Sequence, residues 1–329
     1  MAYTAIDDPE AYFQTVLYTG DGNNSRTITL PGDTDMQPDM IWLKERSSTS
    51  SHYLTSIGMG IGTRVEPDGT SAESTEGLSA VTSDGFTIGT STNQVNQDTI
   101  THVAWCWKES ATAGMDIVTW TGNGSSQNIS HSLSAVPHFM ITKNRSATGD
   151  WTTYHKFGGG TKTFYLSNTD AIGTTSSPWN DTTPTSSVFT VGAGAYTNGD
   201  GNNIIGYLWT EKQGYSKFGS YTGNGNADGV FVYTGFRPAF VLCKISSASG
   251  QDWFILDNKR ENSFNPITVR IQPSNSDAEG TGQTHDLLSN GFKHRVSSVF
   301  ANGSGSTYIY AAFAEAPFVN SNGVPCNAR

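Results

Sequence analysis

The hydrophobic residues of this chain occur in short runs of Val, Ile, Phe, Tyr and Trp, separated by stretches rich in Ser, Thr, Asn and Gly. Short runs bounded by turn-forming residues predict β-strands. Asn-Gly and Asp-Gly pairs, which favour tight hairpin turns, occur at Asp21-Gly22, Asp84-Gly85, Asn123-Gly124, Asn224-Gly225 and Asn290-Gly291. No helical periodicity extends beyond two turns. We therefore expect an all-β protein.

Several landmarks recur at a period of about one hundred residues. Each copy contains an aromatic-Thr-Gly turn, a Pro before an apolar run that ends in Lys, and an aromatic residue two places before a Glu. In the order of the copies they stand at Tyr18, Trp120 and Tyr221, at Pro38, Pro137 and Pro238, and at Trp107, Trp209 and Phe313. The first set is spaced by 102 and then 101 residues. This period indicates copies of domain size, longer than the repeats of solenoids or propellers.

We predict three tandem β-sandwich or jelly-roll-like domains of about 100 residues each, internally repeated. Repeat 1 covers residues 13–114, repeat 2 covers 115–215 and repeat 3 covers 216–318, with a leader (1–12) and a polar tail (319–329). The run after each repeated Pro is apolar at consecutive positions. We expect both faces of that strand to be covered.

Charge is sparse and uneven along the 329 residues. Charged residues make up 15% of the chain, the net charge is −10 and the pI is ≈ 5.1. Phosphate binding draws on clustered Lys and Arg, so we expect no nucleic-acid partner. Residues 1–114 hold 15 acidic and 5 basic side chains, which accounts for the whole acidic excess. This part is either a solvated surface or a surface that meets a basic partner.

The chain carries no sign of a membrane span, a secretory signal or a disulfide framework. No run approaches the ~18 consecutive apolar residues of a spanning helix, and the acidic start lacks the basic-then-apolar order of a signal peptide. Cys106 and Cys243 lie in apolar runs, Cys326 stands apart, and their spacing fits no zinc site. We therefore expect no membrane partner, no metal ion and no cofactor.

The residue patterns of common enzymes are absent from the sequence. Gly303-Ser304-Gly305 lacks the strand-to-helix context of a nucleophile elbow. His285 and Asp286 are neighbours on a predicted strand, where adjacent side chains point to opposite faces. The repeated Glu109, Glu211 and Glu315 favour a salt bridge or a role in joining domains over sugar hydrolysis. We expect no catalytic residues, and calcium binding by the Asp-Gly and Asn-Gly turns is left open.

Three aromatic residues are the candidate ligand-binding set. Tyr53, Trp151 and Trp253 each follow the repeated Pro by 14 or 15 positions and stand in polar surroundings, such as Thr148-Gly-Asp-Trp151. An aromatic ring presented from a polar loop can stack on a sugar. The alternative is that these residues plug the open ends of the sandwiches.

A resemblance to a known family adds to these predictions. Pro38-Asp-Met-Ile-Trp-Leu-Lys-Glu-Arg46, Ser83-Asp-Gly-Phe-Thr-Ile-Gly89, Val103-Ala-Trp-Cys-Trp-Lys108 and the closing Ala311-Ala-Phe-Ala-Glu-Ala-Pro-Phe318 resemble an uncharacterised repeat-domain family of tailed-phage virion proteins. The family is frequent in marine phages and often labelled tail-fibre-like. The resemblance implies a virion structural protein and carries over no catalytic residues.

These observations lead to a ranked expectation about function. The first is a non-enzymatic protein on a phage particle, made in the host cytoplasm and placed in the virion as a capsid decoration or a capsid-associated fibre or knob. Its partners would be other capsid or tail proteins. The alternative is a tail-fibre-type adhesin that binds a host-surface glycan, and the third is a glycan-cleaving enzyme. Homo-oligomer formation, the host and the receptor are left open.

Overall fold

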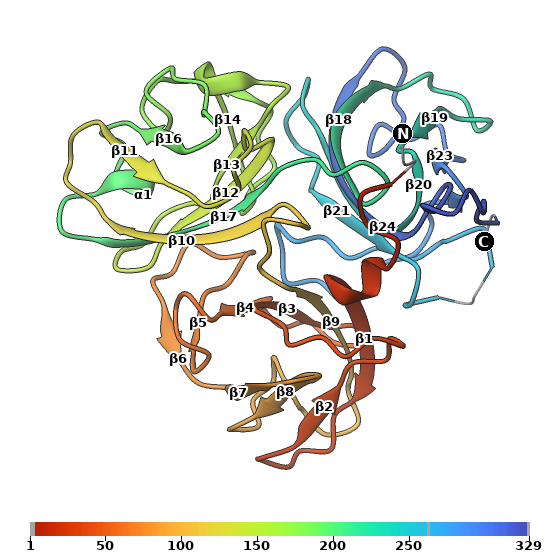
Figure 1. The fold of residues 1–329 in the computed structure, drawn as a ribbon, viewed down its shortest axis with the longest axis horizontal. Coiled ribbons are helices and arrows are strands. Elements are labelled where there is room, and N and C mark those ends of the chain that lie inside the picture. Colours follow the sequence, from red (N-terminus) through yellow and green to blue (C-terminus); the bar gives the residue numbers. More distant parts are fainter. Residues whose placement is uncertain (1–3, 262–263, 328–329) are drawn as a thin grey trace.

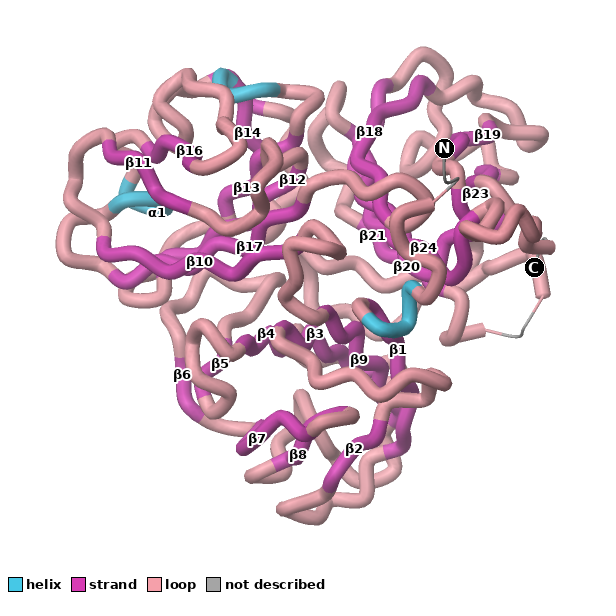
Figure 2. The backbone as a smooth tube through the Cα atoms, viewed as in Figure 1, coloured by secondary structure: helices cyan, strands magenta, loops and turns pink. Residues whose placement is uncertain are grey.

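The computed structural model describes residues 4–261 and 264–327, and there it confirms the all-β prediction. Figure 1 shows three lobes of strands around a common centre, and Figure 2 shows how little helix accompanies them. The helical segments are η1 (Pro9–Ala11), η2 (Gly159–Thr161) and α1 (Ala195–Asn198). None of the helices in the described ranges is long and apolar enough to cross a membrane. Residues 1–3 of the predicted leader and 328–329 of the predicted tail lie outside the described residues.

The first lobe is a β-sandwich. Its strands are β1 (Phe13–Thr19), β2 (Thr27–Thr29), β3 (Met40–Glu45), β4 (Tyr53–Ser56), β5 (Thr63–Arg64), β6 (Ser74–Thr75), β7 (Leu78–Thr82), β8 (Gly85–Ile88) and β9 (Thr101–Trp107). One sheet has the order β1-β9-β3-β4, a second has the order β2-β8-β7, and β5 pairs with β6. Val16 and Cys106 of the first sheet belong to one buried cluster with Ile28 and Phe86 of the second.

The second lobe repeats this plan with a longer sheet. Its strands are β10 (Met115–Thr121), β11 (Gln127–Ser130), β12 (Phe139–Asn144), β13 (Thr152–His155), β14 (Lys162–Tyr165), β15 (Gly173–Thr174), β16 (Val188–Val191) and β17 (Asn203–Trp209). The main sheet has the order β10-β17-β12-β13-β14-β15, and β11 pairs with β16. Met140 and Leu208 of the main sheet form a cluster with Ile129 and Phe189 of the other.

The third lobe has the strands β18 (Ser216–Thr222), β19 (Phe231–Tyr233), β20 (Phe236–Ile245), β21 (Phe254–Asp257), β22 (His285–Leu288), β23 (Gly291–His294) and β24 (Thr307–Pro317). Its sheets have the orders β18-β24-β20-β21 and β19-β23-β22. In every lobe the first strand therefore pairs with the last, and the last pairs with the strand that carries or follows the repeated Pro. Pro238 lies within β20 at a shift in the strand register, where its missing N–H is tolerated. The exact unit boundaries stay predictions.

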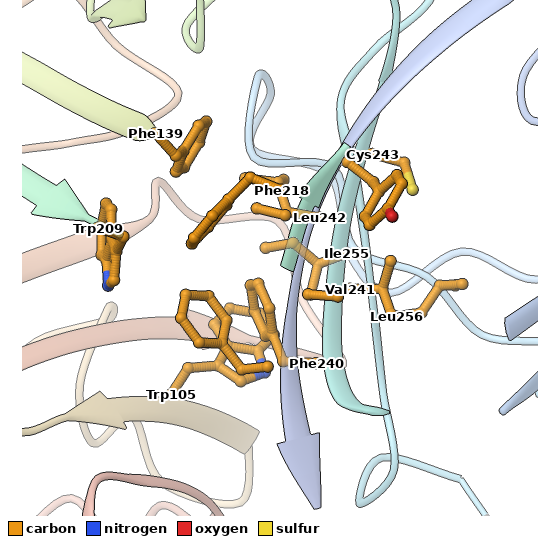
Figure 3. Close-up of a cluster of buried hydrophobic side chains, with 14 of the residues drawn as sticks. Trp105, Phe139, Trp209, Phe218, Phe240, Val241, Leu242, Cys243, Ile255 and Leu256 are labelled. Atoms are coloured by element: carbon orange, nitrogen blue, oxygen red, sulfur yellow. The ribbon is translucent and has the colours of Figure 1, made fainter. Parts of the chain in front are cut away.

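The three lobes meet in one aromatic core. Trp107, Trp209 and Phe313, the aromatic residues that end each repeat, form a triangle with ring centroids 6.3, 6.2 and 5.7 Å apart. Figure 3 shows Trp209 gathered in this space with Phe139 and Phe240. Each fully buried side chain of this size contributes about 1.5–3 kcal/mol relative to exposure. The ladder partners of the three triangle residues are Met40, Phe139 and Phe240.

The repeated Thr-Gly turn is fixed by a close backbone contact and by hydrogen bonds from a buried side-chain amide. A Cβ on Gly20 would lie 1.9 Å from the Gln97 carbonyl oxygen, so only glycine fits at this close approach. The buried Asn96 donates from Nδ2 to Asp21 Oδ1 at 2.7 Å, and its Oδ1 accepts the Asp21 backbone N–H at 3.3 Å. Each turn is therefore held by a buried amide. The same two bonds join Asn198 to Asn123 and Asn302 to Asn224.

Candidate functional site

The three aromatic residues predicted to bind a sugar are buried. Tyr53, Trp151 and Trp253 are at most 1% exposed, so in this structure they present no face on which a sugar ring could stack. Of the two alternatives that the sequence left open, exposure for ligand stacking is wrong and burial is observed, because a neighbouring lobe or the protein's own sandwich covers each ring. Tyr53 lies inside the first sandwich, where its hydroxyl donates to the Glu76 carbonyl at 2.9 Å. Trp151 and Trp253 lie instead where two lobes meet.

The first-lobe counterpart of Trp151 and Trp253 is His52, the residue before Tyr53. The strand registers show this equivalence. The residue that follows each of these three side chains pairs with the residue five positions after the repeated Pro. Each side chain reaches a backbone carbonyl of another lobe, from the second to the first, the third to the second and the first to the third. The pairs are Trp151 Nε1 to Glu66 O at 2.7 Å, Trp253 Nε1 to Tyr165 O at 2.8 Å, and His52 Nε2 with Gln272 O at 3.2 Å. These contacts close a ring.

A buried lysine accompanies each of these contacts. Lys44, Lys143 and Lys244 end the apolar runs behind the repeated prolines and are fully buried. Burial lowers the pKa of each ammonium group to about 8. Backbone carbonyls compensate the charge, and for Lys143 and Lys244 one carbonyl comes from the preceding lobe. The acceptors are Thr70 O (2.8 Å) and Gly149 O (2.6 Å) for Lys143, Thr169 O (3.0 Å) and Gln251 O (2.5 Å) for Lys244, and Glu45 O (3.0 Å) for Lys44.

Ion pairs strengthen two of the three contacts. Arg145 Nε lies 2.6 Å from Glu73 Oε2, and the Glu73 N–H donates to the Arg145 carbonyl at 2.9 Å. Arg46 and Glu279 form the corresponding pair between the first and third lobes at 2.9 Å. At the remaining contact Ser246 stands at the arginine position, so the ion pair is replaced by neutral bonds. The Ile172 N–H donates to the Ser246 carbonyl at 3.1 Å, and the Ala171 N–H donates to Ser249 Oγ at 2.9 Å.

The contact that closes the ring joins lobes that are not consecutive in the chain, and it holds a buried charge network. Arg260 Nε lies 2.5 Å from Asp257 Oδ2, with both side chains fully buried, and Arg260 Nη1 lies 3.1 Å from Glu279. Trp105 Nε1 donates to Asp257 at 2.9 Å across the lobes. Burial alone would raise the pKa of Asp257, but the Arg260 guanidinium outweighs it and holds that pKa below its ordinary value.

The repeated glutamates form a further set of contacts, and most of this set joins lobes. Two of them accept a backbone N–H from the first strand of the following lobe, and the third forms an ion pair within its own lobe. Burial, and then the hydrogen bond with Asp116, raises the pKa of Glu109 to about 7. The contacts are Glu109 Oε1 with Ile117 N at 3.0 Å, Glu211 Oε1 with Phe218 N at 2.9 Å, and Glu315 with Arg237 Nε at 3.0 Å.

His285 and Asp286, the remaining candidates, have different partners. His285 faces His294 with the two Nδ1 atoms 2.8 Å apart, whereas Asp286 forms an ion pair with Arg295 at 2.7 Å. Adjacent strand residues thus point to opposite faces. Within residues 4–261 and 264–327, no three His, Cys, Asp or Glu side chains lie close enough to hold a metal ion.

One open hollow was not expected from the sequence. It has a volume of ≈ 370 Å³ and lies between the connection from the second to the third lobe (211–217), the end of β19 (233–235) and residues 318–319. We call it the lobe 2–3 cleft. Tyr233 lines it and is 54% exposed, with Lys217 Nζ 5.5 Å from its ring centroid. No motif marked the cleft, because its lysines and its tyrosine are not repeated in the other units.

These features define an all-β protein in which three sandwiches close into a ring around a shared aromatic core. The chain belongs to a family described as a domain of unknown function, DUF7483, whose model matches residues 8–317. That match runs from just before η1 to the end of β24 and takes in all three lobes. No curated protein matches the chain.

Proposed function

We propose that this protein is a non-enzymatic structural component of a tailed-phage virion, displayed on the particle surface as a capsid decoration or a capsid-associated fibre or knob. The observation that supports a structural role is the use of the repeated residues. Trp151, Lys143 and Glu211, each with repeat counterparts, bind the backbone of an adjoining lobe. A chain whose repeat serves to join lobes forms a rigid block, which suits a particle surface. The virion assignment itself rests on the resemblance.

The charge distribution suggests which lobe would meet a basic partner. Residues 1–114 carry a net charge of −10, whereas residues 216–329, with 9 basic and 8 acidic side chains, carry +1. Complementary patches steer and orient association more than they strengthen it. We therefore assign the first lobe to solvent or to basic patches of the capsid.

The copy number per virion tests this proposal. Purified particles are analysed by quantitative mass spectrometry, with the major capsid protein as the internal standard. Hundreds of copies would support capsid decoration, and a few to a few dozen would support a tail or vertex fibre. Absence from the particle would contradict the virion role and return attention to a glycan-cleaving enzyme, which new reducing ends from host polysaccharide would reveal.

A tail-fibre-type adhesin for host-surface glycan is the second candidate. The predicted aromatics no longer support it, because Trp151 and Trp253 are buried between lobes. The lobe 2–3 cleft supports it, because Tyr233 presents an exposed ring beside polar side chains. Cell binding that depends on Tyr233, and not on the buried tryptophans, would favour this candidate.

A further inference from the structure

We propose that the lobe 2–3 cleft binds an acidic saccharide, with Tyr233 as the stacking platform and Lys212 and Lys217 as partners of the carboxylate or sulfate groups. The inference deepens the adhesin candidate. It concerns binding by the purified protein, so it can fail or hold independently of where the protein lies on a virion.

The size and the aromatic wall of the cleft suit a small polar ligand. Its volume of ≈ 370 Å³ falls in the range of about 300–1,000 Å³ that is usual for small-molecule sites. Tyr233 is 54% exposed, and Phe231, two residues earlier on the same face of β19, is 43% exposed. An aromatic ring offers an apolar face to the C–H groups of a sugar, and the tyrosine hydroxyl adds a polar end.

The charges around the cleft favour an anion. Lys212 and Lys217 line it, and neither forms an ion pair with another residue in the described part of the chain. The acidic group in the lining, Glu211, already lies 2.5 Å from Lys156 Nζ and accepts the Phe218 N–H. Two ammonium groups that have no ion-pair partner among the described residues, one of them 5.5 Å from the Tyr233 ring centroid, form a local positive site in a protein of net charge −10.

The internal repeat shows that the joint between lobes does not require these residues. The equivalent joint between the first and second lobes has Ser110 in place of Lys212 and Asp116 in place of Lys217, as the matching β-bridges and strand registers show. Asp116 Oδ2 there accepts the backbone N–H of Ser132 at 2.5 Å and is tied to the turn after β11. At the position of this bonded carboxylate, the lobe 2–3 cleft has Lys217, which forms no ion pair among the described residues.

The aromatic wall is also a departure from the repeat. Val232 pairs with Phe292 as Ile129 pairs with Phe189, which places Tyr233 at the position of Ser130. Three changes, two to lysine and one to tyrosine, therefore converge on a single hollow. The joint between the first and second lobes forms without these three residues. Joining lobes therefore does not require them, and they are available to bind a ligand.

The floor of the cleft is already in place without a ligand. The Ala5 N–H donates to the Gln213 carbonyl at 3.2 Å, and the Thr4 hydroxyl donates to the same oxygen at 3.2 Å. A Cβ on Gly214 would lie 2.3 Å from Thr4 Oγ1, so the two segments are in close contact. A site that is ordered beforehand loses less entropy when it binds.

Calorimetric titration of the full chain tests the proposal. The probes are trigalacturonate and a sulfated chondroitin disaccharide, with maltotriose as the neutral match. We expect at least one acidic probe to bind with an affinity that falls with added salt, and maltotriose to bind at least about tenfold more weakly, since one charge-assisted contact is worth about that factor. Lys217→Asp and Tyr233→Ser introduce the residues that stand at the equivalent positions of the joint between the first and second lobes, where the fold accommodates them. Each substitution should weaken binding by about tenfold or more.

A control variant and a competing ligand class complete the test. Lys162→Ala removes a lysine of the second lobe that is outside the cleft lining and should leave binding within about twofold. The proposal is overturned if neither acidic probe binds, if maltotriose binds equally well, or if Lys217→Asp binds as the parent does. Equal binding of a poly-glutamate peptide would also overturn it and would identify an acidic peptide site instead. Copy number on the virion does not enter any of these outcomes.

Discussion

Each of the seven histidines has a pKa below its ordinary value of 6.5, and burial is the leading cause in every case. The histidines of the unfolded chain therefore bind more protons than those of the folded protein once the pH falls below 6.5. By linkage, the free energy of unfolding is highest, as far as the histidines are concerned, above pH 6.5, where they are neutral in both states. This contribution is lost as the pH falls toward the pKa values of the folded protein. Single imidazoles thus make the fold sensitive to acid.

The His285–His294 pair allows this sensitivity to be tested. The two residues pair across β22 and β23 as Leu78 and Ile88 pair in the first lobe. They share one hydrogen bond, and their Nε2 atoms have no bond partner within the described residues. Burial lowers the pKa of His294 to about 3.

We expect His285→Leu/His294→Ile to be neutral or stabilising at pH 7, because both polar partners leave together and apolar groups replace them. Between pH 6.5 and 4 the double variant should lose less free energy of unfolding than the parent. Urea unfolding at several pH values measures both effects. An unchanged acid dependence would show that other histidines cause it.

The buried lysines predict how the free energy of unfolding changes at alkaline pH. The unfolded chain keeps a lysine proton up to the ordinary pKa of 10.5, whereas burial lowers the folded pKa of Lys143 and Lys244 to about 8. The unfolded state then binds more protons above pH 8, so the lysine contribution to stability rises with pH. Above pH 9 the buried Cys106 and Cys243 oppose this rise, because burial raises the pKa of each thiol above 9.0 and only the unfolded chain ionises there.

We therefore expect the free energy of unfolding to rise between pH 8 and 9. Lys143→Met should reduce the slope, even though losing the ammonium also weakens its carbonyl contacts at every pH. Combining it with Lys244→Met should reduce the slope further. Denaturant titrations at pH 8.0, 8.5 and 9.0 give the slopes, and an identical slope in the variants would contradict the prediction.

At the scale of elements, the loops after β5, β14 and β21 each reach another lobe. A few bonds to carbonyl oxygens recur at each of the three contacts, while the ionic part varies. Arg145 pairs with Glu73 at one contact, and Arg46 pairs with Glu279 at another. The recurring bonds should therefore carry the joint, and the ion pairs should modulate it.

Trp151→Phe tests the recurring part. The change removes the donor to the part-buried Glu66 carbonyl and should lower the free energy of unfolding by about 1–3 kcal/mol. Trp179→Phe is the matched control, because Trp179 is equally buried and its Nε1 has no bond partner among the described residues. Chemical unfolding of both variants gives the difference. Equal losses would mean that ring volume matters and the hydrogen bond does not.

At the scale of the whole molecule, a shared core makes the lobes dependent on one another. Trp107, Trp209 and Phe313 each contact the other two, so no lobe can open without exposing an aromatic ring of its neighbours. One family model matches residues 8–317, which run through all three lobes. We expect heat to unfold the full chain in a single cooperative transition.

Trp209→Ala tests this dependence. The substitution should cost about 3–5 kcal/mol, as large-to-small changes of buried aromatics do, and it should lower protection from amide exchange in all three lobes. Trp209→Phe should cost less, because Phe313 already occupies that position in the third lobe. Separate calorimetric transitions, or exchange confined to the second lobe, would contradict a common core.

Some of this could be predicted from the sequence, because it depends on neighbours in the chain. Short apolar runs between Asn-Gly and Asp-Gly turns indicated strands, and the structure is all-β. The period of the landmarks predicted three similar units, and their bounds stay predictions. The aromatic residue before each repeated Glu was recognised as a landmark, although its place in a triangle with Trp107 at one corner was not.

Other features were decided only by the tertiary structure, because the groups that determine them are far apart in the chain. Trp151 stands in a polar stretch, and the sequence left open whether its ring is an exposed ligand platform or a buried plug. Its partner Glu66 lies 85 residues away in another lobe. Lys143 is buried for the same reason. The sequence by itself determined strands, turns and repetition through local propensities. Burial, ring closure and the lobe 2–3 cleft, where Lys217 and Tyr233 meet, followed from long-range packing that no local pattern encodes.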